Sequence, residues 1–374
     1  MEKNSLRKKI AITAAQLLGQ LAVVSIIAVA TLPAGHASAK SAPQSSAKAA
    51  AKSVPKSVAK PPPFSAAPEV REFIEAMHEQ HGFDVEQLTR EFSLIHSNAT
   101  VLRAIRPAAV PELQRSWQRY RERFVNERRT RYGLRFWQEN AAELARAETI
   151  YGVPAQVIVA IIGVETEYGR NTGKFSALEA LATLAFDYPP RAAFFRNELE
   201  QLLLLAREND VSALDIKGSY AGAIGIPQFM PSSQRRYAVD FDGDSQIDLR
   251  RSTTDAIGSV ARFLQMHGWQ AGAPVALPAA VDGDPTPLIA AGIKPQASLQ
   301  QLAQQGVQVS PLSAPDADRP GALIDLPSPD QPTEYWVGFD NFYVITRYNR
   351  SSFYAMSVFQ LAEALREGHP TTAD

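Results

Sequence analysis

Two glutamates at the end of an apolar segment are the residues of this sequence best placed for acid–base chemistry. Residues 154–168 carry apolar side chains on almost every face, which predicts a buried helix. Glu165 and Glu167 come at its C-terminal end, where the helix dipole disfavours a negative charge by about 0.3–1 kcal/mol. Side chains two residues apart on a helix diverge, so at most one of the two shares the buried face. Glu165 follows Ile161 and Ile162 by four and three residues and therefore continues that face.

A buried carboxyl at such a helix end keeps its proton to a higher pH than a carboxyl in water. A neutral carboxylic acid near pH 7 is what a general acid needs to protonate a leaving oxygen, as in the cleavage of a glycosidic bond. We therefore single out Glu165 as a candidate general acid. On this feature alone, the alternative is two solvated glutamates at a frayed helix end.

A glycine-rich segment, residues 218–233, offers a second set of candidate groups. Its glycines permit close backbone approach or positive φ, and its hydroxyl and amide side chains offer hydrogen bonds. Its aromatic side chains have flat faces on which sugar rings can stack. The alternative is a tight turn between helices. The residues concerned are Gly218, Gly222, Gly225, Ser219, Gln228, Ser232, Tyr220 and Phe229.

An acidic loop begins at Asp240 and spaces its carboxylates as an EF-hand does. Asp240, Asp242 and Asp244 take positions one, three and five, and Gln246 would offer its backbone carbonyl at position seven. Hard oxygen ligands at this spacing suit calcium. Position six is Ser245 instead of glycine, and position twelve is an arginine instead of glutamate. An acidic surface turn without a metal is the alternative.

The elements that must hold these residues are predicted to be mostly helical. Apolar residues repeat at three and four from residue 68 to about 205. Residues 270–340 are rich in Ala, Pro, Gly and Asp, and 335–339 and 342–345 have strand composition. We expect a mainly α protein with a small β-rich subdomain inserted. The predicted helices span 117–128, 136–150, 154–168, 178–186, 194–207, 254–267 and 353–365.

The N-terminal part of the sequence predicts an exported protein with a linker before its folded body. A basic start and an apolar run from Ile10 to Leu32 precede Ala37-Ser38-Ala39, so we expect a signal peptide over 1–39, with an uncleaved membrane anchor as the alternative. Residues 40–66 are rich in Ala, Ser, Lys and Pro and predict a linker. The body, 67–374, divides into a helical segment 67–150, a core 151–269 containing the loop 240–255, the β-rich part 270–340 and a return 341–374.

Composition excludes several classes of protein. The chain has no cysteine, so disulfides, thiolate sites and N-terminal lipidation are excluded. The net charge of -1 over 374 residues gives no case for nucleic-acid binding. Residues 1–39 carry +3 and the linker +5, which leaves the body at -9. The histidines form no HExxH pattern and no GxSxG elbow exists, so neither a zinc protease nor an α/β-hydrolase is predicted.

Five segments in order resemble the membrane-bound lytic murein transglycosylase B family. They span roughly residues 68–365, with the weakest match in 271–330. The resemblance implies a periplasmic member without a lipid anchor and with a lysozyme-like helical core, an extra helical domain and a small β domain. The segments are 161–169 (IIGVETEYG), 181–189 (LATLAFDYP), 218–233 (GSYAGAIGIPQFMPSS), 255–261 (DAIGSVA) and 346–354 (TRYNRSSFY).

The implied activity is cleavage of the β-1,4 bond between N-acetylmuramic acid and N-acetylglucosamine in peptidoglycan. One glutamate, matched by Glu165, acts first as acid and then as base, and the product is 1,6-anhydro-N-acetylmuramic acid. No cofactor is implied for this chemistry. The alternatives are a hydrolytic muramidase on the same fold, which would prefer a second carboxylate, and a non-catalytic peptidoglycan-binding protein.

The resemblance also implies roles for individual residues. The sugar cleft would be lined by Ser219, Gln228, Phe229, Tyr348, Asn349, Tyr354 and Tyr120. Arg191 sits where the family places arginines that reach the peptide stem, but Pro190 replaces one of the usual pair. Asp255 would close a structural calcium loop with Asp240, Asp242, Asp244 and Gln246. Glycan strands are the expected partner, and a membrane would be contacted only through an uncleaved N-terminus.

Overall fold

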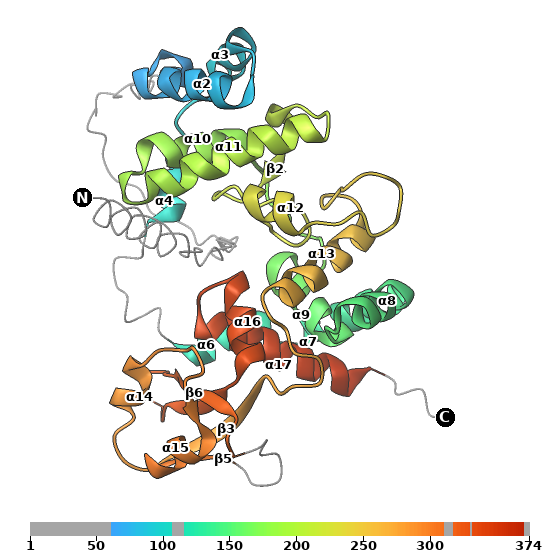
Figure 1. Cartoon of the computed structure of the whole chain (residues 1–374), viewed down its shortest axis with the longest axis vertical. Helices are drawn as coiled ribbons and strands as arrows, with labels where there is room; N and C mark the ends of the chain where they lie inside the picture. Colours follow the sequence, from blue (N-terminus) through green and yellow to red (C-terminus); the bar gives the residue numbers. More distant parts are fainter. Residues whose placement is uncertain (1–60, 107–115, 310–316, 330, 370–374) are drawn as a thin grey trace, which may run out of the picture. The chain divides into compact units, whose positions relative to one another are not determined.

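The computed structural model describes residues 61–106, 116–309, 317–329 and 331–369 (Figure 1). Within them the chain forms two units, 61–98 and 99–369, and the division falls inside the segment 67–150 that we predicted as one part. The predicted signal peptide and residues 40–60 of the predicted linker lie outside the described residues. Among the described helices, none alone has the length and apolar character to cross a membrane. Helices α8 (Ala141–Tyr151) and α9 (Ala155–Thr166) reach that criterion only together, across a bend of 113°.

The first unit is a pair of short helices with its own small core. α2 begins with Pro68 in its first turn and is capped at its C-terminal end by Gly82, whose φ is 67°. Phe64 is buried and its backbone N–H donates to the Ile95 carbonyl at 3.1 Å, so the predicted linker extends a few residues too far. The elements are η1 (Phe64–Ala66), α2 (Pro68–His81) and α3 (Val85–Ser93), and the core is Val70, Ile74, Met77, Leu88 and Phe92.

The second unit is built around one helix that is apolar on all sides. α9 (Ala155–Thr166) buries every residue from 157 to 164. A helix of this kind is stable only when other elements surround it. Helices from four other parts of the sequence pack against it: α7 (Glu127–Glu139), α8 (Ala141–Tyr151), α13 (Thr253–Met266) and α17 (Ser352–Gly368).

Two predicted helices are divided in the structure, in each case at an asparagine. α6 (Trp117–Phe124) stops before Asn126, whose side chain accepts the N–H of Arg129 and starts α7. Asn140 separates α7 from α8, and its amide donates to the Phe136 carbonyl at 2.8 Å. Periodicity missed both breaks because the apolar spacing continues across them.

The second unit has further helices before and after the glycine-rich segment. α10 and α11 lie along each other, and α12 packs on α11. β1 (Phe175–Ser176) and β2 (Lys217–Gly218) form an antiparallel pair at the start of the glycine-rich segment. The elements are α4 (Ala99–Ile105), α10 (Ala177–Asp187), η2 (Pro189–Arg191), α11 (Ala192–Glu208), η3 (Ala213–Asp215), α12 (Pro231–Tyr237) and α16 (Asp340–Tyr348).

A five-stranded antiparallel sheet occupies residues 276–338, within the segment predicted to be β-rich. Leu299, Leu302, Val307, Leu323, Val337 and Phe339 form its core. The strands, in spatial order, are β4 (Ala297–Ser298), β6 (Pro320–Leu326), β7 (Glu334–Gly338), β3 (Ala276–Val281) and β5 (Val307–Val309), with α14 (Thr286–Ala290) and α15 (Leu299–Gln304) beside them (Figure 1).

The predicted strand at 342–345 is wrong, because these residues belong to α16. Phe342 and Ile345 are three residues apart and both fully buried, as on one face of a helix. Here tertiary packing overrides the strand composition of the segment.

Candidate active site

The end of α9 is fixed to the glycine-rich segment by Thr166. Its hydroxyl donates to the Ile226 carbonyl at 2.8 Å and accepts the N–H of Gly169 at 3.0 Å. Beyond it, Glu167 and Tyr168 adopt left-handed backbone conformations, with φ of 52° and 63°, and the chain turns back. Glu165 is therefore held on the last turn of a buried helix, beside the glycine-rich segment.

The carboxyl of Glu165 is set up to hold its proton. Burial raises its pKa to about 8, although a hydrogen bond from the Tyr354 hydroxyl to Oε1, 2.6 Å long, favours the carboxylate. Glu165 as a whole residue is half-buried, so it is not sealed inside the core as its neighbours Val164 and Thr166 are. At neutral pH Glu165 thus combines the accessibility and the protonation that a general acid requires.

Three tyrosines from three helices surround this carboxyl. The pKa values of Tyr120, Tyr348 and Tyr354 are all raised, first by burial and then by the charge of Glu165. The rings of Tyr348 and Tyr354 stack with centroids 6.4 Å apart, and the Tyr348 hydroxyl donates to the Pro227 carbonyl at 2.6 Å. α6, α16 and α17 thereby build one aromatic wall around Glu165.

Glu167 does not join Glu165. Its carboxylate forms an ion pair with Arg128 of α7, on the side where Tyr168 packs between Gly133 and Gly163. Burial raises the pKa of Glu165 and the Tyr354 hydroxyl lowers it, with no contribution from another carboxylate of the described residues. Among the described residues, no second carboxylate is therefore seen to act on Glu165.

The glycine-rich segment forms a compact turn whose backbone needs its glycines. Gly225 has a φ of 75°, and a Cβ there would lie 2.4 Å from the Leu249 carbonyl oxygen. Gln228 also has a positive φ, and its amide nitrogen donates to the carbonyls of Thr172 and Gly225 at 3.0 and 2.9 Å. The amide oxygen of Gln228 is then the group it can offer to a ligand. Ser219 is half-buried, and its hydroxyl oxygen accepts the Ala223 N–H at 3.1 Å.

Two predicted cleft residues have another position in the structure. Phe229 is only 2% exposed and packs on Phe263 and Tyr348, so it supports the wall from behind and offers no face to a sugar. Tyr354 is fully buried and its hydroxyl donates to Glu165, so its ring offers no exposed face to a sugar.

Asn349 and Arg191 belong to different elements, and each has a polar side-chain group suited to binding a ligand. Asn349 is 5% exposed, and its side-chain oxygen has no hydrogen-bond partner among the described residues. A buried acceptor of this kind is costly unless a ligand or water satisfies it. Arg191 lies at the start of α11, where its guanidinium stacks over Phe194 at 4.4 Å from the ring centroid.

The acidic loop brings three of its predicted carboxylate ligands together. Carboxylate oxygens of Asp240, Asp242 and Asp244 lie within 4.8 Å of one another, a donor set that suits a hard cation. Ser245 has a φ of 71°, the left-handed conformation that the sharp turn demands. Gln246 follows, and its N–H donates to Asp244 at 2.8 Å.

Asp255 does not complete this group, contrary to our prediction. It is 1% exposed, and its two oxygens accept the backbone N–H groups of Phe241, Asp242 and Asp248 at 2.7, 3.4 and 2.9 Å. Asp255 therefore fastens the two ends of the loop to α13. Sequence spacing could not distinguish a carboxylate that binds a cation from one that binds backbone.

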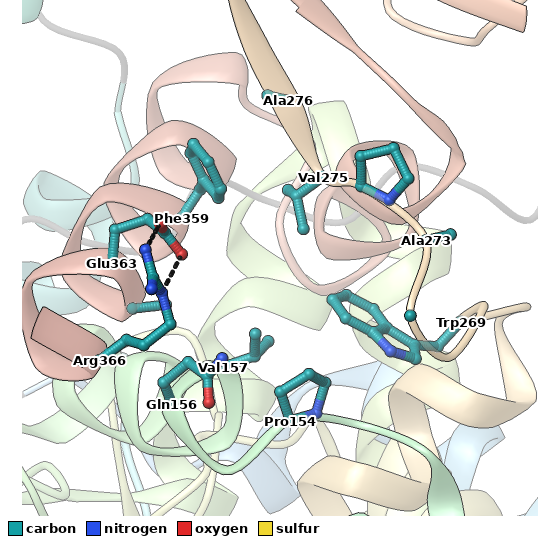
Figure 2. Close-up of a pocket in the computed structure, with 13 residues that line it drawn as sticks. Pro154, Gln156, Val157, Trp269, Ala273, Val275, Ala276, Phe359, Glu363 and Arg366 are labelled. Atoms are coloured by element: carbon teal, nitrogen blue, oxygen red, sulfur yellow. Dashed lines mark hydrogen bonds and ion pairs between the residues drawn. The ribbon is translucent and has the colours of Figure 1, made fainter. Parts of the chain in front are cut away.

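A pocket of about 320 Å³ lies at the other end of α9 (Figure 2). Val157 and Trp269 line it, and the ion pair between Glu363 and Arg366 closes one side. Eight residues of helix, about 12 Å, separate Val157 from Glu165. The pocket is thus distinct from the site around the acid.

Several supporting residues escaped the sequence analysis. Thr166 joins α9 to the glycine-rich segment, and Glu198 of α11 accepts the N–H and hydroxyl of Ser232 at 3.0 and 2.6 Å. Arg129 donates to the Gly163 carbonyl. These contacts join residues far apart in sequence, and no local pattern marks them.

The molecule is a lytic transglycosylase of the lysozyme-like class. Residues 65–363 match the family model described as Transglycosylase SLT domain, and the chain belongs to this family. The chain is similar to membrane-bound lytic murein transglycosylase B of Escherichia coli (strain K12), with 42% identity over 313 residues, which are 81% of this chain and 84% of that protein. The predicted family, fold class and peptidoglycan-cleaving lyase activity are thereby confirmed.

Solved structures agree with this assignment. The lytic transglycosylase SltB1 from Pseudomonas aeruginosa is 47% identical, with a TM-score of 0.75, and the match covers 81% of this chain and 99% of that one. The Escherichia coli lytic transglycosylase Slt35, solved in complex with calcium, is 40% identical, with a TM-score of 0.72 and coverage of 84% and 97%.

Proposed function

We propose that Glu165 is the only catalytic carboxyl and that it cleaves the β-1,4 bond between N-acetylmuramic acid and N-acetylglucosamine. The observation that carries this proposal is a carboxyl with a pKa of about 8, held among tyrosines, whose pKa no other carboxylate of the described part of the chain shifts. Such a group can give a proton at neutral pH and take one back afterwards.

The reaction proceeds in two steps. Glu165 first protonates the leaving glycosidic oxygen, while the N-acetyl oxygen of the muramic acid attacks C1 and the glycosidic bond breaks. The Glu165 carboxylate then removes the proton of the C6 hydroxyl, whose oxygen attacks C1 and reopens the oxazolinium ring. The product is a 1,6-anhydro sugar, and Glu165 is again protonated.

Neighbouring residues bind and orient the sugars in this proposal. The side-chain oxygen of Asn349 accepts an N–H or hydroxyl of the substrate, which its lack of a protein partner supports. Gln228 contributes its amide oxygen, and Ser219 its hydroxyl proton. Tyr354 stabilises the carboxylate between the two steps.

Mass spectrometry of the products tests this function. The purified protein should release muropeptides from peptidoglycan that lack one water relative to hydrolysis products and have no reducible end. Reducing-end products would contradict the proposal and indicate a hydrolytic muramidase. Binding without products would indicate a non-catalytic wall protein.

The pH profile should have its falling limb near pH 8. Glu165 must be protonated for the first step, so kcat/KM is retained below its pKa and lost as pH rises through about 8. Tyr354→Phe removes a hydrogen bond that favours the carboxylate and should move this limb to higher pH, with a lower plateau. Initial rates of wall solubilisation from about pH 3.5 to about pH 9.5 measure both. A limb at pH 4–5 would show that Glu165 titrates as an ordinary carboxyl.

We further propose that the loop of Asp240, Asp242 and Asp244 takes a structural calcium ion. The spacing of these carboxylates supports this, as does the calcium complex of Slt35. A ligand that binds only the folded state stabilises it, so millimolar calcium should raise the melting temperature. Asp244→Asn should reduce that response, and magnesium serves as the comparison. An unmoved melting temperature in calcium would leave the loop as an acidic turn.

We also place the enzyme in the periplasm, where its substrate lies. The basic and apolar N-terminus and the Ala37-Ser38-Ala39 site support export and release by a signal peptidase. N-terminal sequencing of the protein from its cells tests this, and a mature chain that begins at Met1 would indicate an anchor.

A further inference from the structure

Three arginines gather around one tyrosine ring beside the site. The guanidinium carbons of Arg128, Arg131 and Arg170 lie 5.7, 5.9 and 4.2 Å from the centroid of Tyr132. Arg128 and Arg131 extend from α7, and Arg170 from the turn after α9. All three are exposed, with 63% and 64% of the first two side chains accessible. We call these four residues the Tyr132 arginine cluster.

The cluster keeps a positive charge on an acidic body. Arg128 pairs with Glu167, and Arg131 approaches Glu127 at 3.6 Å. Among the described residues no carboxylate pairs with Arg170, whose contact is the face of Tyr132. An arginine whose guanidinium lies over an aromatic ring has its planar donors restricted in orientation, which suits two-point binding of a carboxylate.

Arg170 lies on the chain segment that joins two parts of the site. Five residues separate it from Glu165, a span of at most about 18 Å of extended chain. Two residues further on, the Thr172 carbonyl accepts the amide of Gln228 at 3.0 Å. A ligand bound over Glu165 therefore lies within reach of this guanidinium.

We propose that Arg170, supported by Tyr132 and Arg128, binds a carboxylate of the peptide stem carried by the strand under cleavage. This proposal rests on the proposed function. The glycan itself is neutral apart from its stems, so an exposed arginine at the rim has the stem carboxylates as its matching partner. Pro190 occupies the position of an expected second arginine next to Arg191, and Arg170 supplies a cation from a different element.

The test compares two substrates: peptidoglycan strands with their stems, and the same strands after an amidase has removed them. Arg170→Gln should lower kcat/KM on stem-bearing strands about 5- to 10-fold and leave stem-free strands unchanged. Arg170→Lys should lower kcat/KM on stem-bearing strands by a smaller factor, because lysine keeps the positive charge but lacks the paired N–H donors of a guanidinium. Arg135→Gln is the matched control, since Arg135 is an exposed arginine of α7 that pairs with Glu139 outside the cluster.

An equal loss on both substrates, or no loss on either, would overturn the proposal. Inactivity of the unsubstituted protein on both would overturn the proposed function instead. In that case, cosedimentation with stem-bearing strands tests whether Arg170 binds the stem. Equal retention of the Arg170→Gln and unsubstituted proteins would contradict this binding.

Discussion

Replacing Glu165 with glutamine should abolish turnover of peptidoglycan, with a loss of at least about 10³-fold. General acid–base catalysis alone contributes about 10²–10⁴-fold, and here one group performs both steps. Glutamine has the same shape and can still accept the Tyr354 hydroxyl, so binding of glycan strands should change little. Release of soluble muropeptides measures turnover, and cosedimentation with insoluble peptidoglycan measures binding.

Glu167→Gln is the matched control for this variant. It removes the charge of a glutamate two residues away that pairs with Arg128. We expect activity within a few-fold of the unsubstituted protein. If the two substitutions reduced turnover equally, the assignment of a single acid would be wrong.

Asp255→Ala should produce the largest loss of stability among the substitutions considered. Alanine leaves three backbone N–H groups without their acceptor, two of them in buried or half-buried residues. The loss of their acceptor lowers the free energy of unfolding by about 3 kcal/mol, which lowers the melting temperature by roughly 10 °C in a domain of this size. The measurement belongs in a buffer with chelator, so that a bound cation does not contribute.

Asp244→Ala provides the comparison, because Asp244 is exposed and accepts a single N–H, that of Gln246. Without calcium, the Asp244→Ala substitution should lower the free energy of unfolding by less than about 1 kcal/mol. An Asp255→Ala protein that is as stable as its parent in chelator, yet no longer responds to calcium, would restore Asp255 as a metal ligand.

The sequence predicted those parts of the fold whose signal is local. α9 was predicted because its residues are apolar on every side, and the loop from Asp240 because its carboxylates follow a fixed spacing. The strand predicted at 342–345 was wrong because β-branched and aromatic residues also suit a helix face that is fully buried. The breaks at Asn126 and Asn140 depend on single capping contacts that periodicity does not register.

The candidate site likewise combines features that local sequence predicts with features that depend on packing between distant segments. Glu165 could be singled out from its position on a buried helix, but its hydrogen-bond partner, Tyr354, lies 189 residues away. Only the family resemblance linked these two segments, and it assigned Tyr354 to the substrate instead of the acid. The depth of Phe229 behind Tyr348 likewise depends on packing between distant elements.

The late position of Tyr354 in the chain determines when, during synthesis, the surroundings of the Glu165 carboxyl are complete. The carboxyl emerges early in synthesis and the helix that completes its surroundings emerges last, from Ser352 onward. A nascent or prematurely terminated polypeptide thus carries the acid without the tyrosine that positions it. The complete surroundings of the carboxyl consequently form only after Ser352 and the residues that follow it have been synthesised.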